Sequence, residues 1–102
     1  MKDVDAKQFW EEIKEGTVLV DLWADWCRPC KAIEPYLHEL SQVYTNVKFI
    51  RLNTDEHPEV PMELGVVSIP TILIFKDGQE VKRIVGAKPK HVYRNVLEEV
   101  SR

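Results

Sequence analysis

The sequence predicts an α/β fold with a central mixed β-sheet that is flanked by helices on both faces. Apolar segments of strand type alternate with amphipathic segments of helix type, which favours parallel strands joined by helices. Near the C-terminus an Asp-Gly pair between two strand-like segments is typical of an antiparallel hairpin. A length of 102 residues, of which 44% are hydrophobic, fits one domain over residues 1–102.

Turn residues and hydrophobic periods divide the chain into helices and strands. The predicted elements are a helix over 6–15, a strand over 17–23, a helix over 30–44, a strand over 47–53, a helix over 58–64, strands over 72–75 and 80–85, and a helix over 89–100. Asp5 and Gln8 form a capping box before the first helix, and Gly16 ends it. The first strand is nearly all apolar, as in a strand that is covered on both faces.

The later elements follow from the same kinds of signal. The second helix and the last helix repeat their apolar side chains at helical spacing. Gly65 ends the third helix, and Asp77-Gly78 turns the chain between the last two strands. Helices between the early strands and a hairpin at the end together predict the mixed sheet.

Charge and hydropathy exclude several classes of partner. The formal net charge is −3, and acidic and basic residues are interleaved without a basic stripe, so a nucleic-acid partner is not expected. No apolar segment is long enough to span a bilayer, and residues 1–7 lack the apolar core of a signal peptide. We therefore expect a cytoplasmic protein without membrane contact, and the sequence gives no sign of a state other than a monomer.

Cys27 and Cys30 are the only cysteines, and they lie where a predicted strand passes into a predicted helix. In the cytosol such a pair is more often redox-active or metal-binding than structural. Zinc requires four ligands, and the histidines lie on separate elements without ligand spacing, so no metal site is predicted. A disulfide that closes so short a ring stabilises a fold weakly, by roughly 2 kcal/mol in the loop-entropy model. The pair is therefore predicted to undergo reversible thiol–disulfide exchange.

Within the pair, Cys27 is predicted to attack substrates and Cys30 to resolve the mixed disulfide. Cys27 lies near the positive end of a helix, which favours its thiolate. Arg28 either adds to this effect or is screened by water. Cys30 is expected to be the more buried thiol, one helical turn further along.

Asp21 is the one charged residue in the strand predicted over 17–23. Burial without a partner raises the pKa of a carboxyl group, which would bring Asp21 near neutrality. In that state Asp21 would accept the proton of Cys30, directly or through water, as this thiol attacks. The alternative is a structural acid that is held by a basic partner.

Several motifs follow one another in a characteristic order. They are Val20-Asp21-Leu22-Trp23-Ala24-Asp25-Trp26-Cys27-Arg28-Pro29-Cys30-Lys31, Leu52-Asn53-Thr54-Asp55, Ser68-Ile69-Pro70-Thr71, Lys76-Asp77-Gly78 and Val85-Gly86-Ala87. In these motifs the chain resembles the thioredoxin family over essentially its whole length. The resemblance implies the thioredoxin fold and the reduction of protein disulfides, with no bound cofactor and with electrons supplied by a thioredoxin reductase.

The resemblance also implies roles for individual residues. Cys27 corresponds to the nucleophile, Cys30 to the resolving cysteine and Asp21 to the buried acid. Pro70 matches the family's cis-proline, the alternative being a trans proline at the start of a strand. The implied substrate-binding residues are Trp26, Arg28, Pro29, Ile69, Pro70, Val85, Gly86 and Ala87. The alternative for Trp26 is core packing, and for Gly86 an ordinary turn glycine.

The chain departs from the family pattern at a few positions. Arg28 replaces the usual glycine, which is expected to make the couple more oxidising. This keeps open a thiol oxidase or disulfide isomerase on the same fold, and a further alternative is a binding or folding subunit without redox turnover. Arg51 replaces a common lysine and is expected to hold Asp21 more firmly ionised. Because little sequence precedes the first helix, the family's first strand is expected to be short or missing.

Overall fold

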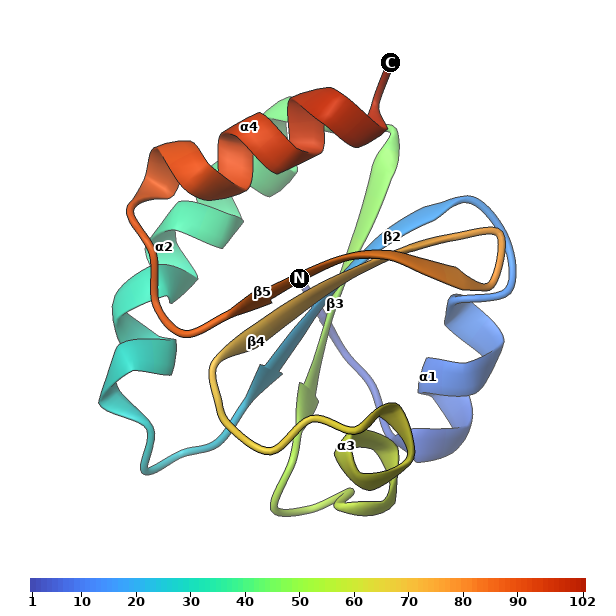
Figure 1. Cartoon of the computed structure of the whole chain (residues 1–102), viewed down its shortest axis with the longest axis vertical. Helices are drawn as coiled ribbons and strands as arrows, with labels where there is room; N and C mark the ends of the chain where they lie inside the picture. The colour runs from blue at the N-terminus through green and yellow to red at the C-terminus, as the bar shows by residue number, and fades with distance from the viewer.

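One mixed sheet and four helices make up the fold. The structure, a computed structural model that describes residues 1–102, contains β1 (Lys2–Asp3), α1 (Ala6–Glu12), β2 (Thr17–Trp23), α2 (Arg28–Val43), β3 (Val47–Asn53), α3 (Glu59–Leu64), β4 (Thr71–Lys76), β5 (Gln79–Val85) and α4 (Lys90–Val100) (Figure 1). The strands lie in the order β1-β3-β2-β4-β5. β1 and β2 pair in parallel with β3, whereas β4 runs antiparallel to β2 and β5, which confirms the predicted mixed sheet.

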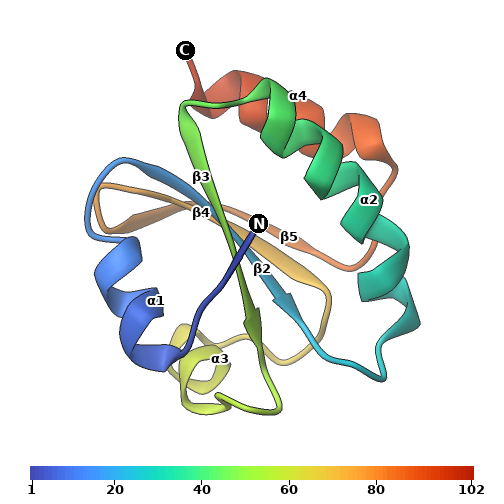
Figure 2. The ribbon, with the colours of Figure 1, turned by 180° about the vertical axis from the view of Figure 1, so that it is seen from behind.

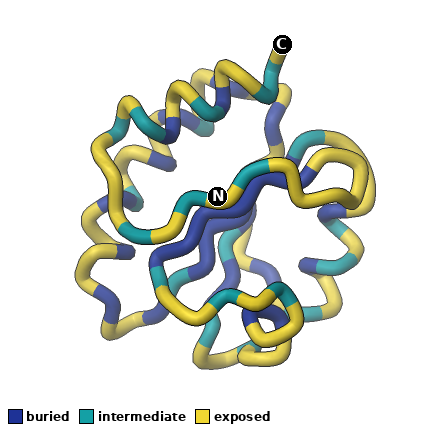
Figure 3. Tube along the Cα trace, viewed as in Figure 1, coloured by how far each residue is buried: buried dark blue, intermediate teal, exposed yellow.

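Helices cover both faces of this sheet. α1 and α3 lie on one face, and α2 and α4 lie together on the other (Figures 1 and 2). Alternate residues of β2 point to opposite faces of the sheet. Val20 packs toward α1 and α3, whereas Leu19 packs toward α2 and α4. Buried residues therefore follow the central strands, and the helices expose their outer sides (Figure 3). No helix combines the length and the apolar character needed to cross a bilayer.

The first two helices differ from their predicted limits. α1 ends at Glu12 rather than at residue 15, because the Lys14 amide bonds to the Glu11 carbonyl at 3.3 Å in a tighter turn. α2 begins at Arg28 rather than at residue 30, because Pro29 fits the first turn, where an amide needs no helical partner. All other boundaries lie within one residue of the predicted ones.

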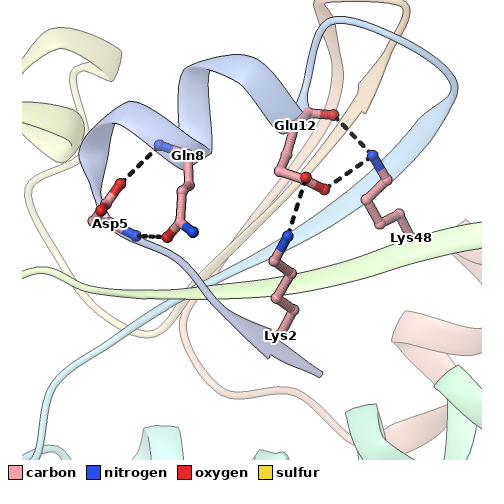
Figure 4. Close-up of polar contacts among 5 residues, drawn as sticks. All are labelled: Lys2, Asp5, Gln8, Glu12 and Lys48. Atoms are coloured by element: carbon pink, nitrogen blue, oxygen red, sulfur yellow. Dashed lines mark hydrogen bonds and ion pairs between the residues drawn. The ribbon is translucent and has the colours of Figure 1, made fainter.

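β1 is reduced to two residues, as expected from the short segment before α1. Lys2 pairs with Ile50 and Asp3 with Arg51 in the register of β3. The Lys2 ammonium lies 3.3 Å from a carboxylate oxygen of Glu12, and Lys48 of β3 contacts the same carboxylate at 3.0 Å (Figure 4). β1 is thus tied to α1 on one face of the sheet and to β3 at its edge.

The capping box of α1 has the predicted geometry. The Gln8 amide donates to Asp5 Oδ1 at 2.8 Å, and the Asp5 amide donates to Gln8 Oε1 at 2.9 Å (Figure 4). Each bond satisfies an amide that the first helical turn leaves unpaired.

Asp5→Ala is expected to lower the free energy of unfolding by about 1 kcal/mol, because the first turn of α1 loses its cap. Urea unfolding of parent and variant measures the loss. Lys7→Ala serves as the control, since Lys7 is exposed on the same turn and takes no part in the capping box. Equal stability of the parent and Asp5→Ala would contradict a stabilising cap.

Candidate functional site

Cys27 lies at the junction of β2 and α2 and is the N-cap residue of α2 (φ −87°, ψ 99°). Its Sγ accepts the backbone N–H of Cys30 at 3.2 Å, as the side-chain oxygens of serine or aspartate do at other helices. Pro29, between the two cysteines, has no N–H that could compete for the sulfur. An anionic sulfur at this position would face an amide and the positive end of α2.

Cys27 and Cys30 are joined by a disulfide, with their Cα atoms 5.3 Å apart. Both belong to a small cluster with Ala24, against which Trp23 and Ile69 pack. The two cysteines are equally buried, each 2% exposed, so the prediction that Cys30 lies deeper is wrong. Cys27 is buried because it shares one cluster with Ala24 and Cys30 and does not project from the surface.

The loop before β4 packs beside this cluster. The Ile69–Pro70 peptide bond is cis, as the resemblance implied, and Pro70 is buried. The Pro70 carbonyl accepts the Gly86 N–H at 2.8 Å, which ties this loop to the end of β5. Gly86 has φ 87°, a conformation that favours glycine, and a Cβ there would meet open space. Its role as a turn glycine therefore suffices to explain the residue.

The remaining residues of the predicted rim are at the surface. They are Trp26, Arg28, Pro29, Val85 and Ala87. Trp26 is 68% exposed, and its indole N–H donates to Asp55 Oδ2 at 2.8 Å, so it is not part of the core. None of the ion pairs in the chain involves Arg28, whose charge stays at the surface beside the cysteines.

A groove beside Trp26 was missed by the sequence analysis. Its volume is about 400 Å³, and its lining consists of Trp26, Thr54, Pro61, Val66, Val67, Ser68 and Ile69. Val67 is 98% exposed although its side chain is apolar. The signal available in the sequence was a pair of valines after Gly65, outside any predicted helix or strand.

Asp21 lies on the central strand with a side chain that is 1% exposed. No hydrogen-bond donor reaches its Oδ1 atom. Burial raises the pKa of Asp21 from an ordinary value of 3.8 to about 7, and the Arg51 charge opposes this shift without cancelling it. The predicted carboxyl group near neutrality is confirmed, whereas the expectation that Arg51 holds Asp21 firmly ionised is wrong.

The contacts of Arg51 explain why its charge lowers the pKa of Asp21 only in part. Its Cζ atom is 3.8 Å from the centre of the Trp23 ring. Its Nε lies 3.4 Å from Asp3 Oδ1, and its Nη1 lies 3.4 Å from Glu34 Oε1. Two other carboxylates thus share the guanidinium charge, and no ion pair joins Arg51 to Asp21.

The chemistry of the site is that of a disulfide and a buried acid. The disulfide sulfur of Cys27 is held against an amide, and Asp21 is near the protonation midpoint at neutral pH. No group of three or more His, Cys, Asp or Glu side chains is arranged to hold a metal ion. The arrangement is suited to moving electrons between sulfurs and a proton to or from a carboxylate.

Comparison with known proteins gives a consistent picture. The family model described as Thioredoxin matches residues 1–99. Thioredoxin 1 of Synechococcus elongatus is 47% identical over 93 residues, which cover 88% of this chain and 87% of the relative. The thioredoxin of a Synechocystis species is 46% identical over 98 residues, with 93% and 92% covered. The structure of Plasmodium falciparum thioredoxin superposes with a TM-score of 0.92 at 34% identity, covering 97% of this chain and 98% of that one.

Asp21→Asn is expected to change how stability depends on pH. From about pH 4 to pH 7 the folded parent keeps a proton on Asp21 that the unfolded chain has lost, so stability falls as the pH rises. Asparagine does not titrate, and the variant should gain roughly 3 kcal/mol relative to the parent between pH 5 and pH 8.5.

Urea unfolding of the oxidised proteins at these two pH values measures the gain. Asp25→Asn is the matched control, because Asp25 is an exposed acid in the following turn. If the parent and Asp21→Asn show the same pH dependence, Asp21 does not carry the buried proton.

Proposed function

The chain belongs to the thioredoxin family and is a thiol–disulfide oxidoreductase, and we propose that it reduces disulfides of other proteins with Cys27 as nucleophile and Cys30 as resolving thiol. The observation that carries these roles is the disulfide at the start of α2, with the Cys27 sulfur against the Cys30 amide. A disulfide in this place is the oxidised product of such a reductase. In the reduced protein the same amide and helix end stabilise a Cys27 thiolate.

The cycle consists of two exchanges. The Cys27 thiolate attacks one sulfur of the substrate disulfide, forms a mixed disulfide and expels the other substrate sulfur as a thiolate, which takes up a proton. Cys30 then loses its proton and attacks the Cys27 sulfur. This step closes the Cys27–Cys30 disulfide and releases the first substrate sulfur as a thiolate. Two electrons pass to the substrate, so a reductase must restore the dithiol.

Asp21 serves as the base for the second exchange. Its buried carboxyl group has a pKa of about 7, so at neutral pH a large fraction is ionised and basic enough to accept a thiol proton. The supporting geometry is its place on β2, whose last residue, Trp23, packs against the cysteine cluster. The proton passes from Cys30 to Asp21 directly or through water.

Substrates bind along the surface around the disulfide. The backbone N–H and C=O of Ile69 make no hydrogen bond within the chain, which leaves them free to pair with an extended substrate segment. Trp26, Arg28 and Pro29 border the cysteines on the other side, and the stretch from Val85 to Ala87 approaches Pro70 through the Gly86 amide. The groove lined by Trp26 and Val67 accepts an apolar side chain of the substrate.

The proposed reaction also indicates the electron donor and the cellular compartment of the protein. A thioredoxin reductase supplies the electrons, as membership of the thioredoxin family suggests. The protein works as a monomer in the cytoplasm or a comparable reducing compartment, where the dithiol is the resting state. Bacterial proteins among its relatives fit this setting.

Cys30→Ser is expected to accumulate covalent complexes with substrate proteins, because the first exchange proceeds while the second has no thiol. Cys27→Ser is the matched control and should trap no complex. Both variants are incubated in reduced form with a disulfide-containing protein such as insulin, and adducts are counted by non-reducing electrophoresis and mass spectrometry. The reverse pattern would exchange the two assigned roles.

Asp21→Asn is expected to slow the resolution of the mixed disulfide at pH 7 by about tenfold or more, because Cys30 loses its base. Stopped-flow measurement of substrate release isolates this step. The first exchange at Cys27 should change much less, and Asp25→Asn should leave both steps unchanged. An unaltered release rate in Asp21→Asn would make Asp21 a structural acid.

A further inference from the structure

Three charged residues form a row across neighbouring strands. Asp3 of β1 is opposite Arg51 of β3, and Arg51 is opposite Asp21 of β2. Laterally paired residues point to the same face of a sheet. Their face is the one that α2 covers (Figure 2). Glu34 of α2 adds a further carboxylate. The Arg51 guanidinium is therefore surrounded by the carboxyl groups of Asp3, Asp21 and Glu34.

The guanidinium contacts only two of these carboxyl groups. Asp3 and Glu34 each lie 3.4 Å from one of its nitrogens, and its Cζ atom lies over the Trp23 ring, 3.8 Å from the ring centre. Asp21 makes no ion pair, and its Oδ1 has no hydrogen-bond donor. Arg51 thus donates a hydrogen bond to Glu34 and forms an ion pair with Asp3 without a hydrogen bond, whereas it makes neither contact with Asp21.

Arg51 is also the one cation that faces Asp21. β1 contributes Asp3, and α2 contributes Glu34, both acidic. β4 contributes the apolar Ile72 as the lateral neighbour of Asp21. From α4, Tyr93 shares the environment of Asp21, but burial raises its pKa above the ordinary value of 10.0, so it is uncharged at neutral pH. The position of the guanidinium therefore decides whether Asp21 has a basic partner.

The short β1 strand accounts for one side of this arrangement. Its two residues point to opposite faces, since Lys2 reaches Glu12 of α1 (Figure 4) while Asp3 reaches Arg51. Arg51 lines a depression of about 580 Å³ together with Glu34 and a separate one of about 310 Å³ together with Asp3. The side chains of Asp3 and Glu34 are 75% and 42% exposed. Asp3 and Glu34 can therefore be changed without opening the core.

We infer that Asp3 and Glu34 are positioning residues for thiol–disulfide exchange: they clamp the Arg51 guanidinium on the Trp23 ring, and Asp21 is thereby left without a basic partner and remains available for proton transfer. This inference rests on the role proposed above for Asp21. Without the clamp, Arg51 turns toward Asp21 and the carboxylate is stabilised, which makes Asp21 a weaker base.

The first test is the titration of the Asp21 carboxyl carbon by NMR in the oxidised full-length protein, where the cysteines do not titrate. Glu34→Gln and Asp3→Asn are each expected to lower the midpoint, and together by roughly one pH unit. Glu34→Gln should have the larger effect, because Asp3 is 75% exposed and its charge is screened by water. Glu39→Gln is the matched control, an acid on α2 whose partner is Lys90, and should leave the midpoint unchanged.

A double-mutant cycle separates the clamp from the simple loss of a nearby negative charge. In an Arg51→Met background there is no guanidinium to release, so Glu34→Gln should move the Asp21 midpoint less than in the parent. An equal or larger shift in that background would overturn the clamp, as would an unchanged midpoint in Glu34→Gln and Asp3→Asn.

The pH profile of mixed-disulfide resolution links the clamp to catalysis. Its inflection should move in Glu34→Gln by the same amount as the NMR midpoint. If the NMR midpoint moves as expected while the rate profile does not, the clamp is supported and the proposed role of Asp21 as base is overturned.

Discussion

The contact between the Cys27 sulfur and the Cys30 amide, 3.2 Å long, is the interaction on which the rest of the site depends. It exists because a strand from the centre of the sheet ends where α2 begins, with Pro29 in the first turn. Ile69, in the loop before β4, packs against the same cluster. The sheet thus fixes the position of the Cys27 sulfur, which follows strand β2 and contacts the Cys30 amide.

The buried acid complements this sulfur. Moving a proton from a thiol of ordinary pKa, about 8.5, to a carboxylate of ordinary pKa is uphill by roughly 6 kcal/mol. With the pKa of Asp21 raised to about 7, the same transfer is uphill by only roughly 2 kcal/mol. The burial that makes Asp21 unfavourable for stability at neutral pH therefore makes it suited to the role of base that we propose for the resolving step. Arg51 would remove this advantage if it were not held by Trp23 and two surface acids.

Much of the fold could be predicted from local signals, because helices, strands and the hairpin follow from periodicity and turn residues. Asp21 could also be found, since one charge in an apolar strand stands out. The errors concern contacts between distant segments. Cys27 and Cys30 are equally buried in a cluster against which Ile69, far away in sequence, also packs. The weak influence of Arg51 on Asp21 depends on partners from β1 and α2. The groove lined by Trp26 and Val67 combines residues of three separate loops with Pro61 of α3. Sequence spacing carries no information about such contacts.

The ionisation of Cys27 in the reduced protein tests the central claim most directly. The rate of alkylation by iodoacetamide would be followed against pH in Cys30→Ser, which keeps the amide that faces the sulfur and leaves one thiol to react. A sulfur held at the start of α2 should become reactive with a midpoint well below 8.5, the ordinary value for cysteine. A midpoint at about 8.5, as for a free cysteine, would contradict the account.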